Sequence, residues 1–195
     1  MNDTPLPTFR FPGGTRIAQV QPPQREPVTL ASPALAVMTD LTEIRAATVQ
    51  SQTSLANAEL KMIHQGVRLL FVIDEMPQVE GIVTAADIQG DKPLRLVQQR
   101  QLRHSEISVA DVMTPLAALD GIDFAALARA TVGQVVATLL KFGHPHLLVV
   151  EGTPGGGPLR IRGLVSQAQV ERQLGTPLPT MEIASTFSEI RQALA

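Results

Sequence analysis

The chain has 195 residues, of which 44% are hydrophobic and 17% charged, and its formal net charge is −2. This composition favours a packed core over wholesale disorder, and the near-neutral charge, with no Trp and no Tyr, argues against a nucleic-acid partner. Because the chain lacks Cys, apolar runs of roughly 20 residues and a signal peptide, we expect a cytoplasmic protein without disulfides, thiolate metal sites or membrane spans.

The first element is a proline-rich arm at residues 1–33. These residues show no sustained hydrophobic period, and proline fixes φ and removes a backbone donor. We therefore expect an extended segment, either loose or wrapped over a neighbouring surface, instead of a helix or a sheet.

From about residue 35 the chain contains the same series of segments twice, in the same order. The matching pairs are AVMT and DVMT at 36–39 and 111–114, residues 52–66 and 129–143, residues 69–74 and 147–152, and GIVT and GLVS at 81–84 and 163–166. The main difference in length is a Gly-rich insertion in the place of a hairpin loop. The expected parts are the arm at 1–33, a first repeat at 34–104, a second repeat at 105–175 and a tail at 176–195.

Each repeat predicts a helix followed by a buried strand. Apolar residues recur at helical spacing, and a glycine follows where a helix C-terminus favours one. These positions are Leu55, Ala58, Met62, Ile63 and Gly66 in the first repeat, and Val132, Val135, Leu139, Leu140 and Gly143 in the second. The apolar runs that follow, LLFVI at 69–73 and LLVV at 147–150, predict strands that are buried on both faces.

Shorter segments complete each unit. A first strand is expected near 46–49 and 122–126, a last strand at 81–83 and 161–165, and a final helix beginning at Thr84 or Ser166. The unit is therefore β-α-β-β-α, and two stacked copies of this α/β unit bury a shared core. Further helices are expected near 92–101 and 184–194, and residues 102–110 link the copies.

The last helix of each repeat begins with a hydroxyl residue three positions before another polar residue. The pairs are Thr84 with Asp87 and Ser166 with Gln169. Both pairs fit a capping box, in which the hydroxyl accepts from a backbone amide and the third side chain reaches back to the cap. On this interpretation both pairs have the same structural task.

The same residues also fit a binding site. Free amides at a helix start attract phosphate, and a carboxylate one turn away can accept hydrogen bonds from the two hydroxyls of a ribose. Thr84 and Asp87 can thus hold a ribose-phosphate unit. Gln169 has one acceptor oxygen and no charge, so it would bind a diol less well.

The order of VMT, a helix ending in GVR, an apolar strand and GIVTAAD resembles the cystathionine-β-synthase (CBS) domain, and two in tandem are similar to a Bateman module. The resemblance covers roughly residues 35–175. It implies two repeats related by a pseudo-two-fold axis, with small mixed sheets flanked by helices. It also implies clefts that bind adenine nucleotides such as AMP, ADP or ATP, no required cofactor, and a homodimer that regulates a separate protein instead of acting as an enzyme.

Carried over to this chain, the resemblance implies a first cleft around Asp87. Thr84 would face the phosphate, Asp87 the ribose hydroxyls, and Arg68 a further phosphate oxygen. The other residues implied at this cleft are Ile82 from the first repeat and Ile122, Phe124, His144 and Pro145 from the second. We expect the nucleotide to bind in this cleft.

The resemblance implies a second cleft, where the sequence departs from the family pattern. Its residues would be Arg45, Ala47, Val67, Leu164, Ser166 and Gln169. Gln169 stands at the Asp position, and Pro145 replaces the basic residue equivalent to Arg68. We therefore expect one nucleotide site per chain.

The remaining polar residues predict no further site. His144 and His146 share a face of a strand, but no Cys and no acidic cluster complete a metal site. Arg160 and Arg162 alternate along a strand, which is typical of a solvated face, although they could also contact an anion. No phosphate loop, nucleophile elbow or HExxH motif is present.

We therefore expect a non-catalytic sensor that binds an adenine nucleotide between its repeats. The alternative is a ligand-free scaffold that dimerises through the same fold, with the arm and the C-terminal helix as docking elements and both hydroxyl pairs as plain helix caps. A ligand shifts conformations only through a difference in its affinity for them, so binding measurements separate the two interpretations.

Overall fold

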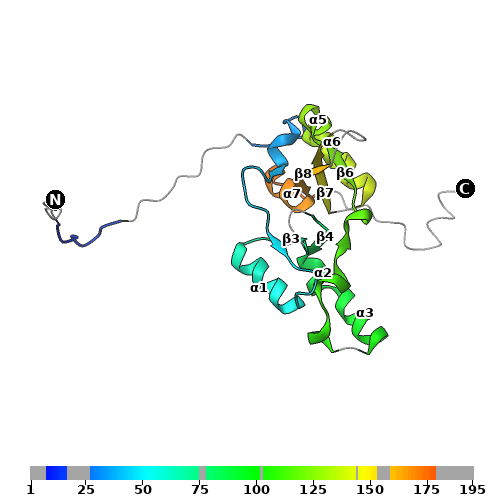
Figure 1. The fold of residues 1–195 in the computed structure, drawn as a ribbon. Coiled ribbons are helices and arrows are strands. Elements are labelled where there is room, and N and C mark those ends of the chain that lie inside the picture. Colours follow the sequence, from blue (N-terminus) through cyan, green and yellow to red (C-terminus); the bar gives the residue numbers. More distant parts are fainter. Residues whose placement is uncertain are drawn as a thin grey trace, which may run out of the picture.

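Figure 1 shows the fold in a computed structural model of the chain. The structure describes residues 8–16, 27–74, 78–101, 103–143, 145–152 and 159–178. The elements of the second repeat lie in the upper half of Figure 1 and those of the first in the lower half. No helix in these ranges combines the length and the apolar character that crossing a membrane requires.

The first repeat is built around a parallel strand pair and a hairpin. Its elements are β2 (Thr48–Val49), α1 (Leu55–Gln65), β3 (Leu69–Val72), β4 (Gly81–Thr84) and α2 (Ala85–Gln89), followed by α3 (Asp91–Arg100). β2 runs parallel to β3, and β3 pairs antiparallel with β4. This order confirms the predicted β-α-β-β-α unit.

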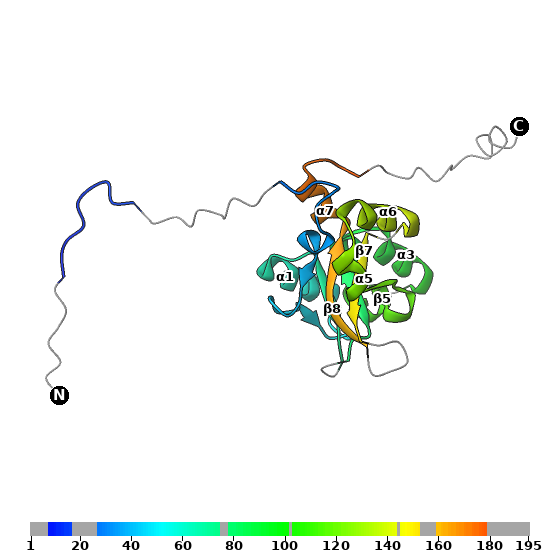
Figure 2. The ribbon, with the colours of Figure 1, turned by 90° about the horizontal axis from the view of Figure 1, so that it is seen from above.

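The second repeat has the same order, with a short additional helix between its first strand and its main helix. Its elements are β6 (Gly121–Asp123), α5 (Phe124–Arg129), α6 (Val132–Phe142), β7 (His146–Glu151), β8 (Arg160–Ser166) and α7 (Gln167–Leu174). Short segments lie at the start of each repeat: η1 (Ala34–Val37) and β1 (Thr39–Asp40) in the first, and, from the boundary onward, η2 (His104–Glu106), α4 (Val109–Val112), β5 (Thr114–Pro115) and η3 (Leu116–Ala118) in the second. Seen from above, α1 lies on one side of the strands and α3 and α6 on the other (Figure 2).

Each sheet takes one edge strand from the start of the other repeat. The strand orders are β1-β8-β7-β6 and β2-β3-β4-β5. β1 lies at the start of the first repeat but pairs with β8 of the second, and β5 lies near the start of the second repeat but pairs with β4 of the first. This reciprocal exchange ties the two halves together about their pseudo-two-fold axis.

The exchanged strands explain the glycine that opens GIVT and GLVS. A Cβ at Gly81 would lie 2.3 Å from the Thr114 carbonyl oxygen, and a Cβ at Gly163 would lie 2.5 Å from that of Thr39. Neither glycine has a positive φ. Glycine is therefore needed here for space beside the incoming strand, not for an unusual backbone conformation.

Three clusters of buried apolar side chains form the core, one within each repeat and one between them. Side chains alternate along a strand, so Leu70 of β3 faces the helices of its own repeat, whereas Leu69 and Phe71 face the other repeat. They pack with Ile82 of β4 and Leu148 of β7. This third cluster fixes how the two repeats sit against each other.

The predicted helices are confirmed in both repeats, and so are the predicted strands except the one over 122–126. Gly66 directly follows α1 and Gly143 directly follows α6, with φ of 64° and 66° in the left-handed region that glycine tolerates. α3 matches the helix predicted near 92–101. The buried face of α1 is narrower than predicted, because this helix packs along a single stripe: Met62 is 4% exposed, but Ile63 is 66% exposed.

One strand prediction is wrong in its second half. The sequence predicts a strand over 122–126, but β6 ends at Asp123 and α5 begins at Phe124. Asp123 caps this helix, because its Oδ1 accepts a hydrogen bond from the Ala126 amide at 2.9 Å. An Asp directly before a helical segment is a signal for a helix start. The match between the two repeats concealed this signal, because the first repeat has no helix at the equivalent position.

Residues 27–33 of the arm lie against the second repeat. The carbonyl oxygens of Leu30 and Ser32 accept hydrogen bonds from the amides of Gly133 and Val132, at 2.8 and 2.9 Å. These bonds satisfy amides that the start of α6 leaves without helical partners. The ranges 1–7 and 17–26 of the arm, and the helix predicted at 184–194, lie outside the described residues.

Candidate functional site

Thr84 and Asp87 form a complete capping box at the start of α2. The Thr84 hydroxyl accepts from the Asp87 amide at 3.2 Å, and Asp87 Oδ2 accepts from the Thr84 amide at 3.0 Å and from its hydroxyl at 2.7 Å. The predicted cap is therefore confirmed. It also holds the carboxylate, whose side chain is 13% exposed, in one orientation.

A lysine from the next helix binds the other oxygen of this carboxylate. Lys92 Nζ forms an ion pair with Asp87 Oδ1 and donates a second hydrogen bond to the Val112 carbonyl oxygen at 3.0 Å. Lys92 lies in the first turn of α3, and Val112 is the last residue of α4. Lys92 was not predicted at this site, because only the break between helices at Gly90 brings it back to Asp87.

Arg68 lies beside the start of α2 through its backbone. Its carbonyl oxygen accepts from the Ala85 amide at 2.9 Å, and its side chain is exposed. The same bond recurs in the second repeat, from the Gln167 amide to the Pro145 carbonyl oxygen at 2.9 Å. Pro145 therefore occupies the position equivalent to Arg68, and the second position has no cation.

His146 of the second repeat lies close enough to Asp87 for the carboxylate charge to affect its pKa. His146 begins β7 at the position that Leu69 holds in β3. Because side chains alternate along a strand, His146 faces the same way as Leu148, which packs between the repeats. Burial lowers the pKa of His146, and the negative charge of Asp87 opposes this shift as the smaller effect. A neutral imidazole is therefore expected near the carboxylate at neutral pH.

This histidine makes the stability of the fold depend on pH. The pKa of His146 is lower in the fold than its ordinary value of 6.5. As the pH falls toward and below 6.5, the unfolded chain therefore binds more protons than the folded chain. We expect the free energy of unfolding to fall between about pH 7.5 and about pH 5.5. His146→Leu should reduce that loss, because Leu69 already fills the equivalent position. Urea unfolding of both proteins at the two pH values measures the effect, and an equal loss in both would assign it to other groups.

The other residues predicted at this cleft have different surroundings. Ile82 packs between the repeats, whereas Ile122 and Phe124 pack against the core of the second repeat. Pro145 is exposed, and His144 lies outside the described residues. The side chains and backbone groups that surround the candidate site are those of Arg68, Thr84, Asp87, Lys92 and His146.

Ser166 and Gln169 do not repeat the capping box. The Gln169 amide donates to the Ser166 hydroxyl at 3.2 Å, but Gln169 Oε1 accepts from the Thr39 hydroxyl at 2.9 Å. The prediction of a second capping box is therefore wrong, because β1 brings Thr39 alongside α7. Gln169 uses its acceptor oxygen within the protein, and Leu164, predicted at the same cleft, packs at the edge of the cluster between the repeats.

Three residues predicted for the second cleft line one pocket. Arg45, Ala47 and Val67 border a cavity of about 480 Å³, together with Lys61 and Gln65 of α1. Within the described residues, the lining of this pocket comes from the first repeat alone. The two predicted halves of the second cleft therefore do not meet in this cavity.

A larger cavity, of about 1110 Å³, lies between the hairpin ends of the two repeats. Its walls include Phe71 and Ile73 where β3 ends, and Glu151 and Ile161 where β7 ends and β8 begins. None of its described lining residues is predicted for either cleft. The candidate site is therefore placed at Asp87 by its polar geometry and not by cavity size.

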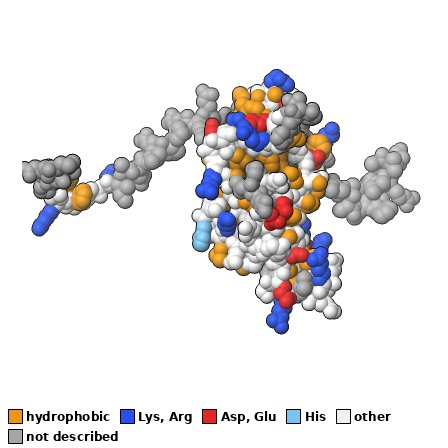
Figure 3. Space-filling model, in the orientation of Figure 1, with side chains coloured by type: hydrophobic (Ala, Val, Ile, Leu, Met, Phe, Trp, Pro, Cys, Tyr) orange, Lys and Arg blue, Asp and Glu red, His pale blue; other side chains and the backbone are white. Residues whose placement is uncertain are grey.

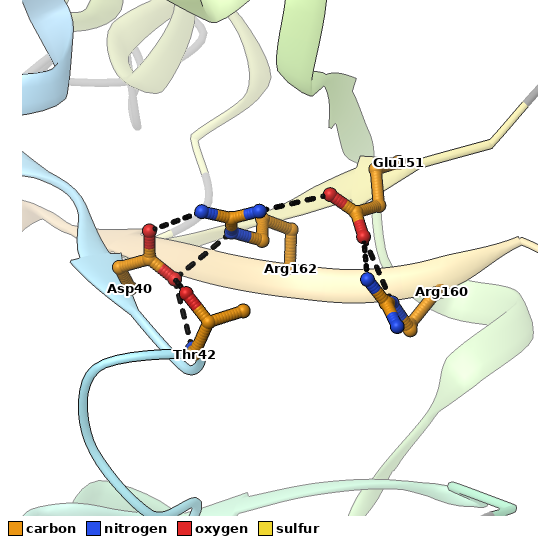
Figure 4. A network of polar contacts seen from close by, with 5 residues as sticks. All are labelled: Asp40, Thr42, Glu151, Arg160 and Arg162. Carbon is orange, nitrogen blue, oxygen red and sulfur yellow. Dashed lines mark hydrogen bonds and ion pairs between the residues drawn. The ribbon is translucent and has the colours of Figure 1, made fainter.

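Arg162 is the centre of a charged network that joins β8 of the second repeat to β1 (Figure 4). Its guanidinium donates to both oxygens of Asp40, at 2.9 and 2.8 Å, and to Glu151 at 3.2 Å, while Glu151 also pairs with Arg160. The guanidinium also lies over the Phe124 ring, 4.9 Å from its centroid. The hydrogen bonds from Arg162 are the main reason that the pKa of Asp40 is well below its ordinary value. The two arginines therefore form ion pairs within the protein instead of a purely solvated face, and Arg162 binds β1 to β8.

The described residues give no support to a metal site. Among them, no group of three or more His, Asp or Glu side chains is placed to hold a metal ion. His64 is exposed on α1.

Known proteins share part of this sequence and its fold. A family model for the CBS domain matches residues 36–90. The crystal structure of CBSX2, a CBS-pair protein from Arabidopsis thaliana, in complex with AMP is similar, with 20% sequence identity and a TM-score of 0.50. The match covers 72% of this chain and 94% of that chain.

Two further structures show the same arrangement. An uncharacterized conserved protein from Pyrococcus horikoshii has 22% identity and a TM-score of 0.53, over 78% of this chain and 99% of that chain. The CBS domain of a bacterial CNNM/CorC family Mg²⁺ transporter, in complex with the inhibitor IGN95a, has 15% identity and a TM-score of 0.51, over 77% and 81%. No curated protein matches the sequence. At these identities the likeness shows the fold.

Proposed function

We propose, from the premise that this chain has the fold of a CBS pair with a CBS domain at residues 36–90, that it is a regulatory module that binds an adenine nucleotide between its repeats. The proposed ligand is AMP, ADP or ATP, with one molecule per chain at Asp87. One observation carries the proposal: the carboxylate of Asp87 is held rigidly by Thr84 beside the junction of the two repeats.

The site offers a partner for each part of a nucleotide. Asp87 can accept hydrogen bonds from ribose hydroxyls. Arg68 has an exposed side chain, and its backbone lies beside the start of α2, so its guanidinium can donate to a phosphate oxygen. By strand alternation His146 shares a face of β7 with Leu148 of the apolar cluster between the repeats, and a mostly apolar surface with a few polar groups suits a base.

The comparison with CBSX2 supports the ligand class. That protein has this fold and was crystallised with AMP. The proposal is for binding without catalysis, because the sequence contains no phosphate loop, nucleophile elbow or HExxH motif. As in the Bateman modules that the sequence resembles, the proposed module is a homodimer that acts on a separate protein in the cytoplasm.

Calorimetric titration of the whole chain with AMP, ADP and ATP tests the proposal. We expect at least one of them to bind at one molecule per chain, with a Kd on the order of 1 μM, equivalent to about −8 kcal/mol. If all three fail to bind at millimolar concentration, the ligand-free scaffold is the better description. In that case the capping box at Thr84 and the exchanged strands have structural roles alone.

Gln169→Ala tests whether the second cleft also binds. We expect the affinity for AMP to change by less than about twofold, because distant sites act independently. The variant loses the hydrogen bond from Thr39, so the free energy of unfolding should fall by about 1 kcal/mol. Calorimetry and urea unfolding measure the two effects. A large loss of affinity, or two molecules of AMP bound per wild-type chain, would show that the second cleft is a site.

A further inference from the structure

The acceptor capacity of Asp87 is nearly filled before any ligand arrives. A carboxylate offers about four acceptor positions, two on each oxygen. The Thr84 amide and hydroxyl occupy Oδ2, and Lys92 occupies a position on Oδ1. A ribose has two vicinal hydroxyls, so both can donate to Asp87 only if one of the present donors leaves.

Lys92 is the donor best placed to leave. The bonds from Thr84 close the capping box within one turn of α2 and keep the carboxylate oriented. Lys92 instead reaches Asp87 from α3 on a flexible side chain that is 50% exposed. The ammonium group is the more exposed partner, because the Asp87 side chain is 13% exposed, so water can solvate Lys92 once the ion pair breaks.

Loss of this ion pair would affect more than the binding site. Lys92 Nζ also holds the Val112 carbonyl oxygen at the end of α4, directly before the exchanged strand β5. At its other end α3 is held in the same way, because Arg100 pairs with Asp111 Oδ1 at 2.8 Å while Asp111 Oδ2 closes a capping box with Ser108. Charged side chains of both signs gather at this end of the molecule (Figure 3).

We propose that Lys92 is a latch that a ribose-containing ligand displaces from Asp87, and that its displacement loosens the contact between α3 and α4. This inference rests on the proposed function, because it concerns the same carboxylate. It assigns α3 a role in that function: the helix reports occupancy of the site to the segment that joins the repeats. The latch also favours the unoccupied state, so it lowers the affinity for the ligand.

Neutral nucleosides test the competition without the charge of a phosphate. We expect Lys92→Met to bind adenosine about fivefold more tightly than the wild type, the factor expected for an ion pair at the protein surface with one exposed partner. 2′-Deoxyadenosine has one hydroxyl on that side and can use the one open position, so its affinity should change by less than about twofold. Calorimetry with the two nucleosides measures this difference.

Arg100→Met is the matched control. It removes one cation of α3 and one ion pair to a capping-box carboxylate, but Asp111 is outside the candidate site. Adenosine affinity should therefore be unchanged in this variant. Hydrogen exchange gives a second readout: AMP should speed the exchange of α3 amides in the wild type, and Lys92→Met should show the faster exchange without AMP.

The outcomes separate the latch from the proposed function. If AMP, ADP, ATP and adenosine all fail to bind the wild type, both proposals are overturned. If adenosine binds the wild type and Lys92→Met equally well, the latch alone is overturned. Weaker binding by Lys92→Met would also overturn it, because Lys92 would then contact the ligand instead of competing with it.

Discussion

Asp87→Ala is expected to weaken AMP binding about a hundredfold, a change of about 2.7 kcal/mol. Hydrogen bonds to a charged acceptor contribute about 1.5–3 kcal/mol each, so losing the contacts to a ribose diol is sufficient for this effect. The same substitution removes the side chain that reaches back to Thr84. The free energy of unfolding should therefore fall as well, by about 1 kcal/mol.

Two control variants separate the loss of the ligand contact from the loss of the helix cap. Asp87→Asn keeps an acceptor for the Thr84 amide but lacks the charge, so it should keep most of the stability and lose most of the affinity. Asp111→Ala removes a capping box and an ion pair of the same kind away from the site, so it should lose stability alone. Calorimetry and urea unfolding measure the two quantities. If Asp87→Ala is less stable but binds AMP normally, capping is the only role of Asp87.

Gly81→Ala is expected to lower the free energy of unfolding by about 1–3 kcal/mol, the usual effect of inserting a methyl group into a packed region. The added Cβ would lie 2.3 Å from the Thr114 carbonyl oxygen, a backbone atom that cannot rotate away. Either β5 must move or β4 must bend. Gly163→Ala should act in the same way on β1, where the distance to the Thr39 oxygen is 2.5 Å.

Gly121→Ala is the matched control for this steric effect. Gly121 is also a strand glycine, but the nearest atoms to a Cβ there lie at an ordinary contact distance of 3.7 Å. We expect its stability to stay within about 0.5 kcal/mol of the wild type. Urea unfolding of the three variants compares them directly. Equal stability of Gly81→Ala and Gly121→Ala would show that the exchanged strand shifts without loss of stability.

The elements with a clear hydrophobic period could be predicted from the sequence, and those fixed by tertiary pairing could not. The helix from Leu55 to its terminal Gly66 shows both periodicity and a stop signal, so it was predicted closely. β1 and β5 are two residues long, too short to show any period. Their exchange between the sheets therefore had no local sequence signal, although Gly81 and Gly163 mark where they pack.

The candidate site was predictable to the same extent. Thr84 and Asp87 are close in the sequence and interact through a local rule of helix capping, so their geometry follows from their spacing. Lys92 and His146 reach the site from other elements, and Gln169 meets Thr39 across 130 positions of the chain. Such contacts depend on how the repeats pack, which no spacing within one repeat encodes.

The reciprocal exchange of β1 and β5 determines the smallest part of the chain that can fold as a unit. A fragment ending after the first repeat would leave β4 as an open edge, and open strand edges pair with other chains. Two copies of one repeat could cover both open edges as a symmetric dimer, in which the strand at the start of each copy pairs with the sheet of the other. When the two repeats are joined in one chain, the exchanged strands pair within the same molecule. Their pairing then depends on the effective concentration that the linker sets, and not on the protein concentration.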